Sequence, residues 1–380
     1  MKKICFITST RADYGLLKWS MKEVQSSADL QLQVIATGMH LSPVFGETYK
    51  EIEIDQIQVD EKVSLGSLDD SVNSVNLQLS EAVKNISQAL IRLQPDAVVL
   101  LGDRYEILGA AQAAFFLSIP IIHLHGGEKT EGAFDDVIRH CITKLSQYHI
   151  TSTEVYRQRV IQLGEAPERV FNLGAPGLEN FLKQNLMSKE ELAKSLGATF
   201  LSKNVLVTFH PVTGASEDIS NLLRALEKFP NVGQFISLPN SDPGYSKIAT
   251  SLKDYAAKNP NVFLFTNLGP LKYSSMLKIA DLVVGNSSSG ILESPFVGTK
   301  TLNIGERQKG RLYDDEIVTH VECREKEIYE ALNTLLKEPY TKQNSLLYGT
   351  GNFAKPFIKL ISQLKFTNQK KFHDLERVNA

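Results

Sequence analysis

Ionisable side chains are concentrated in one stretch, residues 98–140, where two apolar runs each end in glycine and charge. The first run reads V-V-L-L-G-D-R-Y-E, the second reads I-P-I-I-H-L-H-G-G-E, and F-D-D-V-I-R-H follows. A buried parallel sheet explains the apolar runs but not the ionisable groups at their ends. Carboxylates and histidines drawn together have displaced pKa values, which general acids and bases need. The candidate acid–base residues are Asp103, His125, Glu128, Asp135 and Asp136.

Each of these groups also has a structural interpretation, namely turn chemistry, helix capping or a surface charge network. That interpretation is strong for Asp135 and Asp136, because acidic residues favour the first turn of a helix. The spacing H-x-H-x-x-E of His123, His125 and Glu128 also raises a metal site. Glycines that let the backbone approach a ligand follow His125, however, and the usual clustering of Cys, His and Asp ligands is missing, so no metal is expected.

A second candidate site is G-N-S-S-S-G-I-L-E, residues 285–293, in which a strand, a small flexible turn and a helix start follow one another. Backbone N–H groups at a helix N-terminus suit a phosphate, and serine hydroxyls add hydrogen bonds. Glu293, one turn into the helix, can accept from sugar hydroxyls, whereas a purely structural role would be a serine N-cap with a solvated glutamate. The candidate ligand-binding residues here are Ser287, Ser288, Ser289, Gly290 and Glu293.

Other nucleotide and hydrolase motifs are missing. No G-x-x-x-x-G-K-[ST] occurs, and no G-x-G-x-x-G follows the first strand, so P-loop and dinucleotide-binding functions are weakly supported. The sequence also lacks the G-x-S-x-G of serine hydrolases.

Short apolar runs alternate with amphipathic segments throughout, which predicts parallel, doubly wound sheets with helices on both faces. In the first half we expect strands at 3–8, 32–37, 97–101, 119–124 and 149–152, and helices at 16–26, 72–93, 105–117 and 136–145. In the second half we expect strands at 205–209, 233–238, 262–265, 282–284 and 300–304, and helices at 218–228, 245–257, 271–279, 289–296, 325–336 and 353–364.

The fold class is therefore α/β, with two Rossmann-like domains and a cleft between them. The first domain is expected at 1–175, a linker at 176–203, the second domain at 204–352, and a last helical segment at 353–380. Ligands of such sheets bind at the carboxyl ends of the strands, facing the cleft. Polar residues repeatedly follow the predicted strands, namely Arg11, His40, Asp103, Arg104, His125, Glu128, His210 and the serines of residues 287–289.

Composition narrows the class of protein. The chain has 380 residues, 42% hydrophobic and 22% charged, as expected for a soluble globular protein of two domains. The net charge of −2 gives no basic excess for nucleic acid. Three scattered cysteines favour reduced thiols in a cytoplasm. The apolar stretches are too short or too interrupted for a signal peptide or a membrane span.

Seven motifs occurring in order resemble the hydrolysing UDP-N-acetylglucosamine 2-epimerases of sialic-acid-type sugar biosynthesis, and together they run over most of the chain. They are S-T-R-A-D-Y-G (9–15), G-D-R-Y-E (102–106), H-x-H-G-G-E (123–128), D-D-x-x-R-H-x-x-T-K (135–144), F-H-P-V-T (209–213), N-S-S-S-G-I-x-E (286–293) and G-E-R-Q-x-G-R (305–311).

The resemblance implies a glycosyltransferase-B-type fold whose C-terminal helix packs on the first domain, with UDP bound mainly by the second domain. By motif, Ser287, Ser288 and the Gly290 turn would hold the diphosphate, and Glu293 the ribose hydroxyls. His210, Arg11 and Arg307 would lie near the phosphates. No cofactor is implied, and the family suggests a homo-oligomer, either a dimer or a tetramer.

The implied reaction has two steps. A base removes the proton at C2 of the sugar while UDP leaves C1, which gives a 2-acetamidoglucal. Water then adds with inversion at C2, which gives N-acetylmannosamine and UDP. The acid–base candidates for these steps are Asp103, Glu128 and one of Asp135 and Asp136.

The chain departs from the family pattern at His125, where several family members carry a catalytic Glu in H-x-E-G-G-E. Histidine can transfer protons near neutral pH, so the departure leaves activity possible and the identity of the base open. A close branch acts on UDP-N,N′-diacetylbacillosamine, which is a second candidate substrate. Three further functions stay open, namely a non-hydrolysing epimerase, a glycosyltransferase of the same fold and a non-catalytic UDP-sugar-binding protein.

Overall fold

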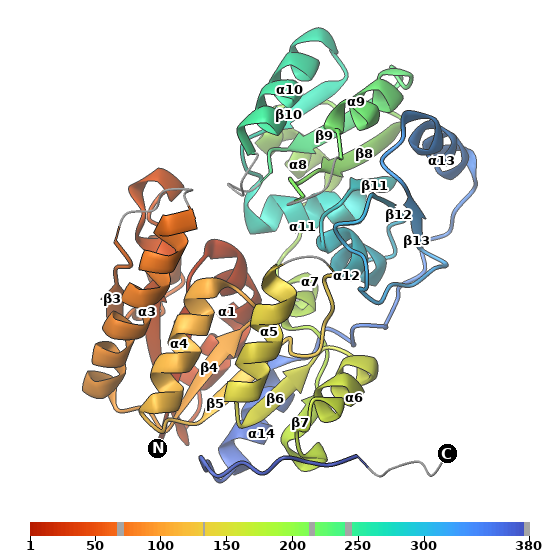
Figure 1. Ribbon diagram of the computed structural model, residues 1–380. Helices are drawn as coiled ribbons and strands as arrows, with labels where there is room; N and C mark the ends of the chain where they lie inside the picture. Colours follow the sequence, from red (N-terminus) through yellow and green to blue (C-terminus); the bar gives the residue numbers. More distant parts are fainter. Residues whose placement is uncertain (67–71, 132–133, 213–216, 240–244, 376–380) are drawn as a thin grey trace. The chain divides into compact units, whose positions relative to one another are not determined.

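The computed structural model describes the chain except residues 67–71, 132–133, 213–216, 240–244 and 376–380, and it contains two compact units (Figure 1). The first unit comprises Met1–Glu128, Gly132–Glu179 and the chain from Gly349 onward. The second comprises Lys129–Glu131 and Asn180–Tyr348. Thr213, at the end of the F-H-P-V-T motif, lies outside the described residues.

The first unit is built on a seven-stranded parallel sheet with the order β3-β2-β1-β4-β5-β6-β7. This order starts at β1 and winds outward in both directions, so the chain reverses direction between β1 and β4, where ligands of doubly wound sheets bind. The strands are β1 (Lys2–Thr8), β2 (Leu30–Thr37), β3 (Glu61–Val63), β4 (Ala97–Leu101), β5 (Ile121–Leu124), β6 (Tyr148–Thr151) and β7 (Val170–Asn172).

Helices cover both faces of this sheet because alternate residues of its central strands point to opposite cores. In β1, Ile4 and Phe6 join one core cluster, and Cys5 and Ile7 join the other. Helices α1 and α14 pack in the first of these clusters, and α3, α4 and α5 line the second (Figure 1). The helices are α1 (Arg11–Gln25), α2 (Tyr49–Ile54), α3 (Val72–Leu93), α4 (Tyr105–Phe116), α5 (Phe134–Leu145), α6 (Glu154–Gln162) and α14 (Ala354–Gln363).

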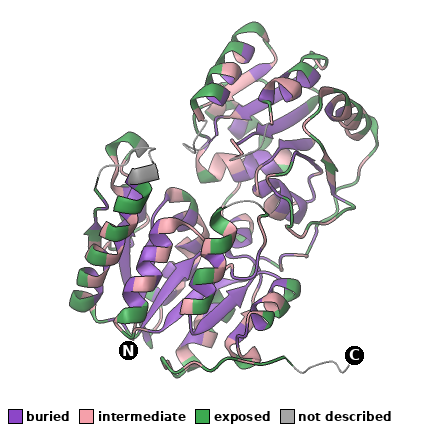
Figure 2. Ribbon diagram, in the orientation of Figure 1, coloured by how far each residue is buried: buried purple, intermediate pink, exposed green. Residues whose placement is uncertain are grey.

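The second unit repeats this winding in a six-stranded parallel sheet of order β10-β9-β8-β11-β12-β13, so its chain reverses between β8 and β11. The strands are β8 (Lys203–Thr208), β9 (Val232–Ser237), β10 (Val262–Phe265), β11 (Leu282–Gly285), β12 (Thr301–Ile304) and β13 (Val318–Val321). The helices are α7 (Asn180–Lys183), α8 (Lys189–Leu196), α9 (Ile219–Glu227), α10 (Tyr245–Lys258), α11 (Gly269–Ile279), α12 (Ser289–Phe296) and α13 (Glu325–Lys337). Figure 2 shows that the strands of both sheets are buried while the helices are exposed on one side.

The predicted pair of Rossmann-like sheets is confirmed. Several predicted element boundaries are wrong by one or two residues, and the largest error is at the first helix. The helix expected to begin at residue 16 begins at Arg11, because Thr10 accepts from Asp13 N and Asp13 accepts from the backbone of Thr10. This capping box satisfies N–H groups that would otherwise lack partners at the helix start. Several short elements had not been expected, including the edge strands β3 and β13.

The last helix, α14, belongs to the first unit and is held at both ends. Its first N–H, from Ala354, donates to the Glu179 carboxylate at 2.7 Å. Lys2 Nζ donates to the carbonyl oxygens of Ser362 and Leu364, at 2.6 and 2.8 Å, just at and after the helix end. Between these ends Phe357 is fully buried against the core of the first sheet.

We expect Phe357→Ala to lower the free energy of unfolding by about 3–5 kcal/mol, because truncating a buried Phe leaves a cavity. Urea titration followed by circular dichroism measures this change. Lys359→Ala is the matched control, since Lys359 is exposed on the same helix, and it should change stability by no more than about 0.5 kcal/mol. Equal stability of the two variants would show that α14 is not part of the first core.

Candidate active site

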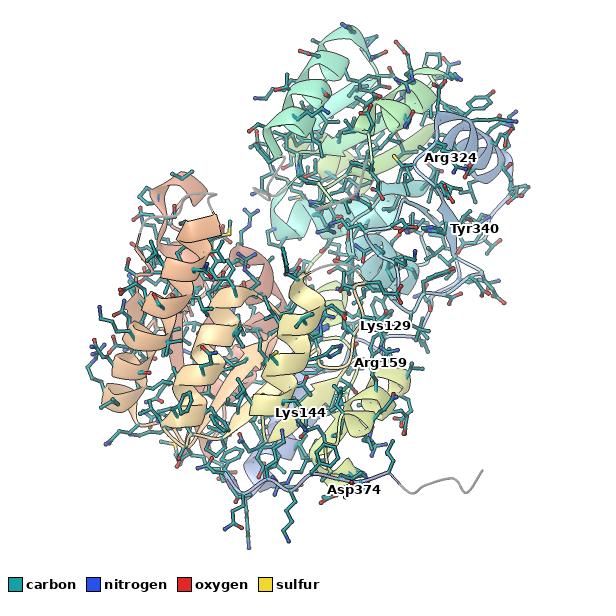
Figure 3. All side chains as sticks on the ribbon, in the orientation of Figure 1. Lys129, Lys144, Arg159, Arg324, Tyr340 and Asp374 are labelled. Atoms are coloured by element: carbon teal, nitrogen blue, oxygen red, sulfur yellow. The ribbon has the colours of Figure 1, made fainter. Side chains whose placement is uncertain are left out.

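His125 and Glu128 form a hydrogen-bonded pair in the loop that follows β5. His125 Nδ1 lies 2.5 Å from Glu128 Oε1, and the same oxygen accepts from Ser152 Oγ at 3.1 Å. The side chains of His125 and Glu128 are 11% and 3% exposed, so the pair is largely shielded from water. The loop itself is held from α6, where Arg159 Nη1 donates to the carbonyl oxygen of Gly127 at 2.5 Å (Figure 3).

Arg139 of α5 connects three of the predicted acid–base residues. Its guanidinium donates to the Asp103 carboxylate, to Asp136 Oδ1 at 3.2 Å and to the carbonyl oxygen of Glu128 at 2.8 Å. Only 1% of the Arg139 side chain is exposed, so its charge is balanced by these acceptors rather than by water. Asp135, the remaining candidate, is exposed in the first turn of the same helix.

His123 is fully buried and has a structural role. Its Nε2 lies 2.8 Å from the carbonyl oxygen of Gly102 and its Nδ1 lies 3.2 Å from Thr143 Oγ1. Burial lowers the pKa of His123 to about 3, so the ring is neutral and fixes the turn that precedes Asp103. Within the described part of the chain, no three His, Cys, Asp or Glu side chains are grouped so that they could hold a metal ion.

Arg104 and Arg11 follow the two strands at which the first sheet reverses direction. Arg104 Nε donates to Glu106 Oε1 at 2.7 Å, and Glu106 is 1% exposed. Burial disfavours the charge of Arg104, but the Glu106 carboxylate more than offsets this, and the pKa of Arg104 is raised above its ordinary value. Arg11 is the first residue of α1, and its side chain is 35% exposed, 3.9 Å from the Glu51 carboxylate.

In the second unit, the serine turn lies at the start of α12 as predicted. Ser288 occupies the N-cap position but its side chain makes no capping hydrogen bond. The Ser289 hydroxyl instead donates to Ser287 Oγ at 3.0 Å and lies 2.5 Å from the Tyr273 hydroxyl. Gly290 is buried, and a Cβ there would lie 2.8 Å from Thr301 Cγ2, so its place in the turn is also a packing requirement.

Asn286 ties together the loops that follow β8, β11 and β12. Its side chain accepts from His210 N at 2.7 Å and donates to the His210 carbonyl oxygen at 2.9 Å. Its own carbonyl oxygen accepts from Arg307 at 3.2 Å and from Gln308 at 2.9 Å. Burial, with the charge of Arg307 nearby, lowers the pKa of His210 to about 3, so that ring is neutral.

Glu293 lies one turn into α12. Burial raises the pKa of Glu293 to about 7, which brings its titration into the physiological range. Tyr273 of α11 lies near this carboxylate, and burial raises the pKa of Tyr273 as well, so the phenol stays protonated and can donate a hydrogen bond.

The structure adds residues for which the sequence analysis proposed no role, namely Arg139, Ser152, Tyr273 and Asn286. The contact of Arg139 with Asp136 could have been predicted from the sequence, because side chains three residues apart meet on the surface of a helix. The contact of Tyr273 with Ser289 could not, because Tyr273 comes from α11 and meets Ser289 only through the fold.

Comparison with known proteins places these motifs in a family. The family model described as UDP-N-acetylglucosamine 2-epimerase matches residues 22–362. The "GDP/UDP-N,N'-diacetylbacillosamine 2-epimerase (hydrolyzing)" of Campylobacter jejuni is 42% identical over 322 residues, which cover 83% of this chain and 84% of that protein. The "Polysialic acid biosynthesis protein P7" of Escherichia coli is 35% identical over 390 residues, covering 99% of this chain and 98% of that protein.

Solved structures show the same fold. The crystal structure of the UDP-GlcNAc 2-epimerase from Neisseria meningitidis, bound to UDP-GlcNAc, aligns with a TM-score of 0.82 and 18% identity. The alignment covers 95% of this chain and all of that one, which confirms the predicted glycosyltransferase-B-type fold. Among the described residues, no helix has the length and apolar character needed to cross a membrane. The family model covers most of the chain, residues 22–362. The chain therefore belongs to the UDP-N-acetylglucosamine 2-epimerase family.

Proposed function

We propose that the chain is a hydrolysing 2-epimerase that converts a UDP-linked 2-acetamido sugar and water into the free 2-epimer and UDP. The observation that carries this proposal is the buried network around Arg139, which gathers Asp103, Asp136 and the His125–Glu128 loop at one edge of the first sheet. A protein that only binds UDP-sugars needs no such set of acid–base groups.

Two substrates fit the proposal. One is UDP-N-acetylglucosamine, which would give N-acetylmannosamine for sialic-acid-type sugars. The other is UDP-N,N′-diacetylbacillosamine, which is favoured by the 42% identity to the diacetylbacillosamine 2-epimerase of Campylobacter jejuni. The reaction at C1 and C2 is the same for both, because the two sugars differ at C4 and C6.

In the first step a base takes the C2 proton, the C–H electron pair forms the C1=C2 double bond, and the C1–O pair leaves with UDP. Water then adds to C1 and a proton returns to C2 from the other face. Proton transfer on both faces requires more than one acid–base group, and Asp103, His125, Glu128, Asp135 and Asp136 are proposed to supply them. Arg139 orients the Asp103 and Asp136 carboxylates for this role.

Negative charge develops on the diphosphate as the C1–O bond breaks, and donors placed there lower the barrier. We propose that Ser287, Ser288, Ser289 and the backbone at Gly290 bind the diphosphate at the N-terminus of α12. Arg307, with neutral His210 beside it, adds a charged donor from the loop after β12. Arg11 and Arg104 are proposed further contacts to the substrate, and Glu293 is proposed to accept from the ribose hydroxyls.

We further propose that the enzyme works in the cytoplasm as a homo-oligomer, either a dimer or a tetramer, without a cofactor. The family resemblance supports this assembly. Light scattering of the purified protein distinguishes it from a monomer.

Nuclear magnetic resonance in deuterated water tests the reaction. Incubation with either UDP-sugar should give UDP and the free 2-epimer, with deuterium at C2 of the product. A UDP-linked epimer would instead indicate a non-hydrolysing enzyme. Failure to turn over both substrates would contradict the proposed function.

The affinity for UDP should fall as the pH is lowered from 8 to 6. Burial raises the pKa of Glu293 to about 7, so the carboxylate that accepts from ribose is present above this pH and is lost below it. Calorimetric titration of wild type and Glu293→Gln over this range measures the effect. UDP itself titrates near pH 6, but this contribution is common to both proteins and cancels in their ratio. A wild-type to variant ratio independent of pH would contradict the role of Glu293.

A further inference from the structure

His125 is held in a backbone conformation that side chains rarely adopt. Its φ is +65°, in the left-handed region, which is strained for a residue other than Gly. The loop is held in place at His125 and at Gly127. His125 N donates to the Ile150 carbonyl oxygen at 3.0 Å. Gly127 packs so closely against α6 that a Cβ there would lie 2.4 Å from the Tyr156 carbonyl oxygen. Strain that is maintained by its surroundings in this way is concentrated at functional sites.

The hydrogen bond to Glu128 decides which nitrogen of His125 carries the proton. A carboxylate accepts hydrogen bonds, so Nδ1 is the donor to Glu128 Oε1, and Nε2 is the nitrogen left to accept a hydrogen bond or to take up a proton. Nε2 is buried and makes no hydrogen bond to any residue that the structure describes. Leaving a buried polar atom without a partner is unfavourable, and a substrate atom that bonds to Nε2 would remove this penalty.

The Glu128 carboxylate, in contrast, is engaged within the protein. Its Oε1 accepts from both His125 and Ser152. The backbone carbonyl oxygen of Glu128 accepts from Arg139. A carboxylate behind an imidazole fixes the tautomer and stabilises the imidazolium that forms when the ring takes a proton. The other ionisable groups around the loop are engaged as well. His123 is neutral, Arg139 pairs with the Asp103 and Asp136 carboxylates, and Arg159 donates to the Gly127 carbonyl oxygen.

We propose that His125 Nε2 is the atom that exchanges the C2 proton with the substrate. Of the five acid–base candidates, Glu128 then acts through His125 as a positioning residue and not on the substrate itself. This inference rests on the proposed function and assigns one of its bases. In the elimination step the Nε2 lone pair forms the new N–H bond as the C2–H bond breaks. The electrons of that C–H bond form the C1=C2 double bond, and UDP leaves with the C1–O pair.

The pH dependence of kcat/KM separates the two roles. In the wild type, kcat/KM should fall at low pH, because a base that already holds a proton cannot take the one at C2. Glu128→Gln removes the carboxylate that stabilises the imidazolium, so the acid limb should remain but move to lower pH by about one unit or more. If Glu128 were itself the base, the same substitution would abolish that limb.

His125→Asn tests the base directly, and Asn tolerates the left-handed conformation. Loss of a general base should lower kcat about 10²–10⁴-fold while leaving the affinity for UDP unchanged. His373→Gln is the matched control. His373 lies near the C-terminal end of the chain, and this variant should retain wild-type activity. If His125→Asn does not fold, the displacement of the limb in Glu128→Gln decides the question alone.

Two results would overturn the assignment in an enzyme that is active as wild type. One is a near-wild-type rate in His125→Asn, and the other is loss of the acid limb in Glu128→Gln. A wild type inactive on both UDP-sugars is a different outcome, because it removes the proposed function and the assignment with it.

Discussion

The buried charge of Arg139 is the constraint on which the candidate active site depends. A guanidinium that is 1% exposed must be matched by acceptors, because an uncompensated buried charge costs several kcal/mol. The acceptors of Arg139 come from three places in the chain. They are the Asp103 carboxylate after β4, the Glu128 carbonyl oxygen after β5, and the Asp136 carboxylate, one turn before Arg139 on α5. Satisfying one charge therefore fixes the relative positions of the acid–base candidates.

The second unit achieves a similar convergence with neutral groups. Asn286 joins three loops through four hydrogen bonds, with the backbone of His210 on one side and the side chains of Arg307 and Gln308 on the other. Its position directly after β11 lies where the sheet reverses direction, which is the usual ligand site of such sheets. The start of α12, with its serine hydroxyls, is thus held in place by hydrogen bonds within the protein.

Much of this architecture follows from sequence pattern, because central strands of parallel sheets are continuous apolar runs. The central strand at 97–101 matches its predicted bounds for this reason. The strand at 262–265 lies at the edge of its sheet and also matches, because all four of its residues are apolar. The start of α1 was misplaced because Gly15 suggests a loop, although the capping box of Thr10 and Asp13 was readable. The edge strands β3 and β13 are short and only partly buried, so they carry no continuous apolar run.

The candidate site was predictable as a set of residues but not as a geometry. The sequence grouped His123 with His125 and Glu128 as possible metal ligands. The fold instead buries His123 between Gly102 and Thr143 and pairs His125 with Glu128. The left-handed φ of His125 and the contact of Tyr273 with Ser289 are set by tertiary packing, which no local pattern encodes.

The central claim is that the enzyme breaks the C2–H bond of a UDP-linked 2-acetamido sugar. A substrate labelled with deuterium at C2 tests this most directly when it is converted in ordinary water and the free sugar is analysed by mass spectrometry. We expect the product to have lost the deuterium to solvent and the labelled substrate to react more slowly than the unlabelled one. A product that retains deuterium at C2 would contradict the claim.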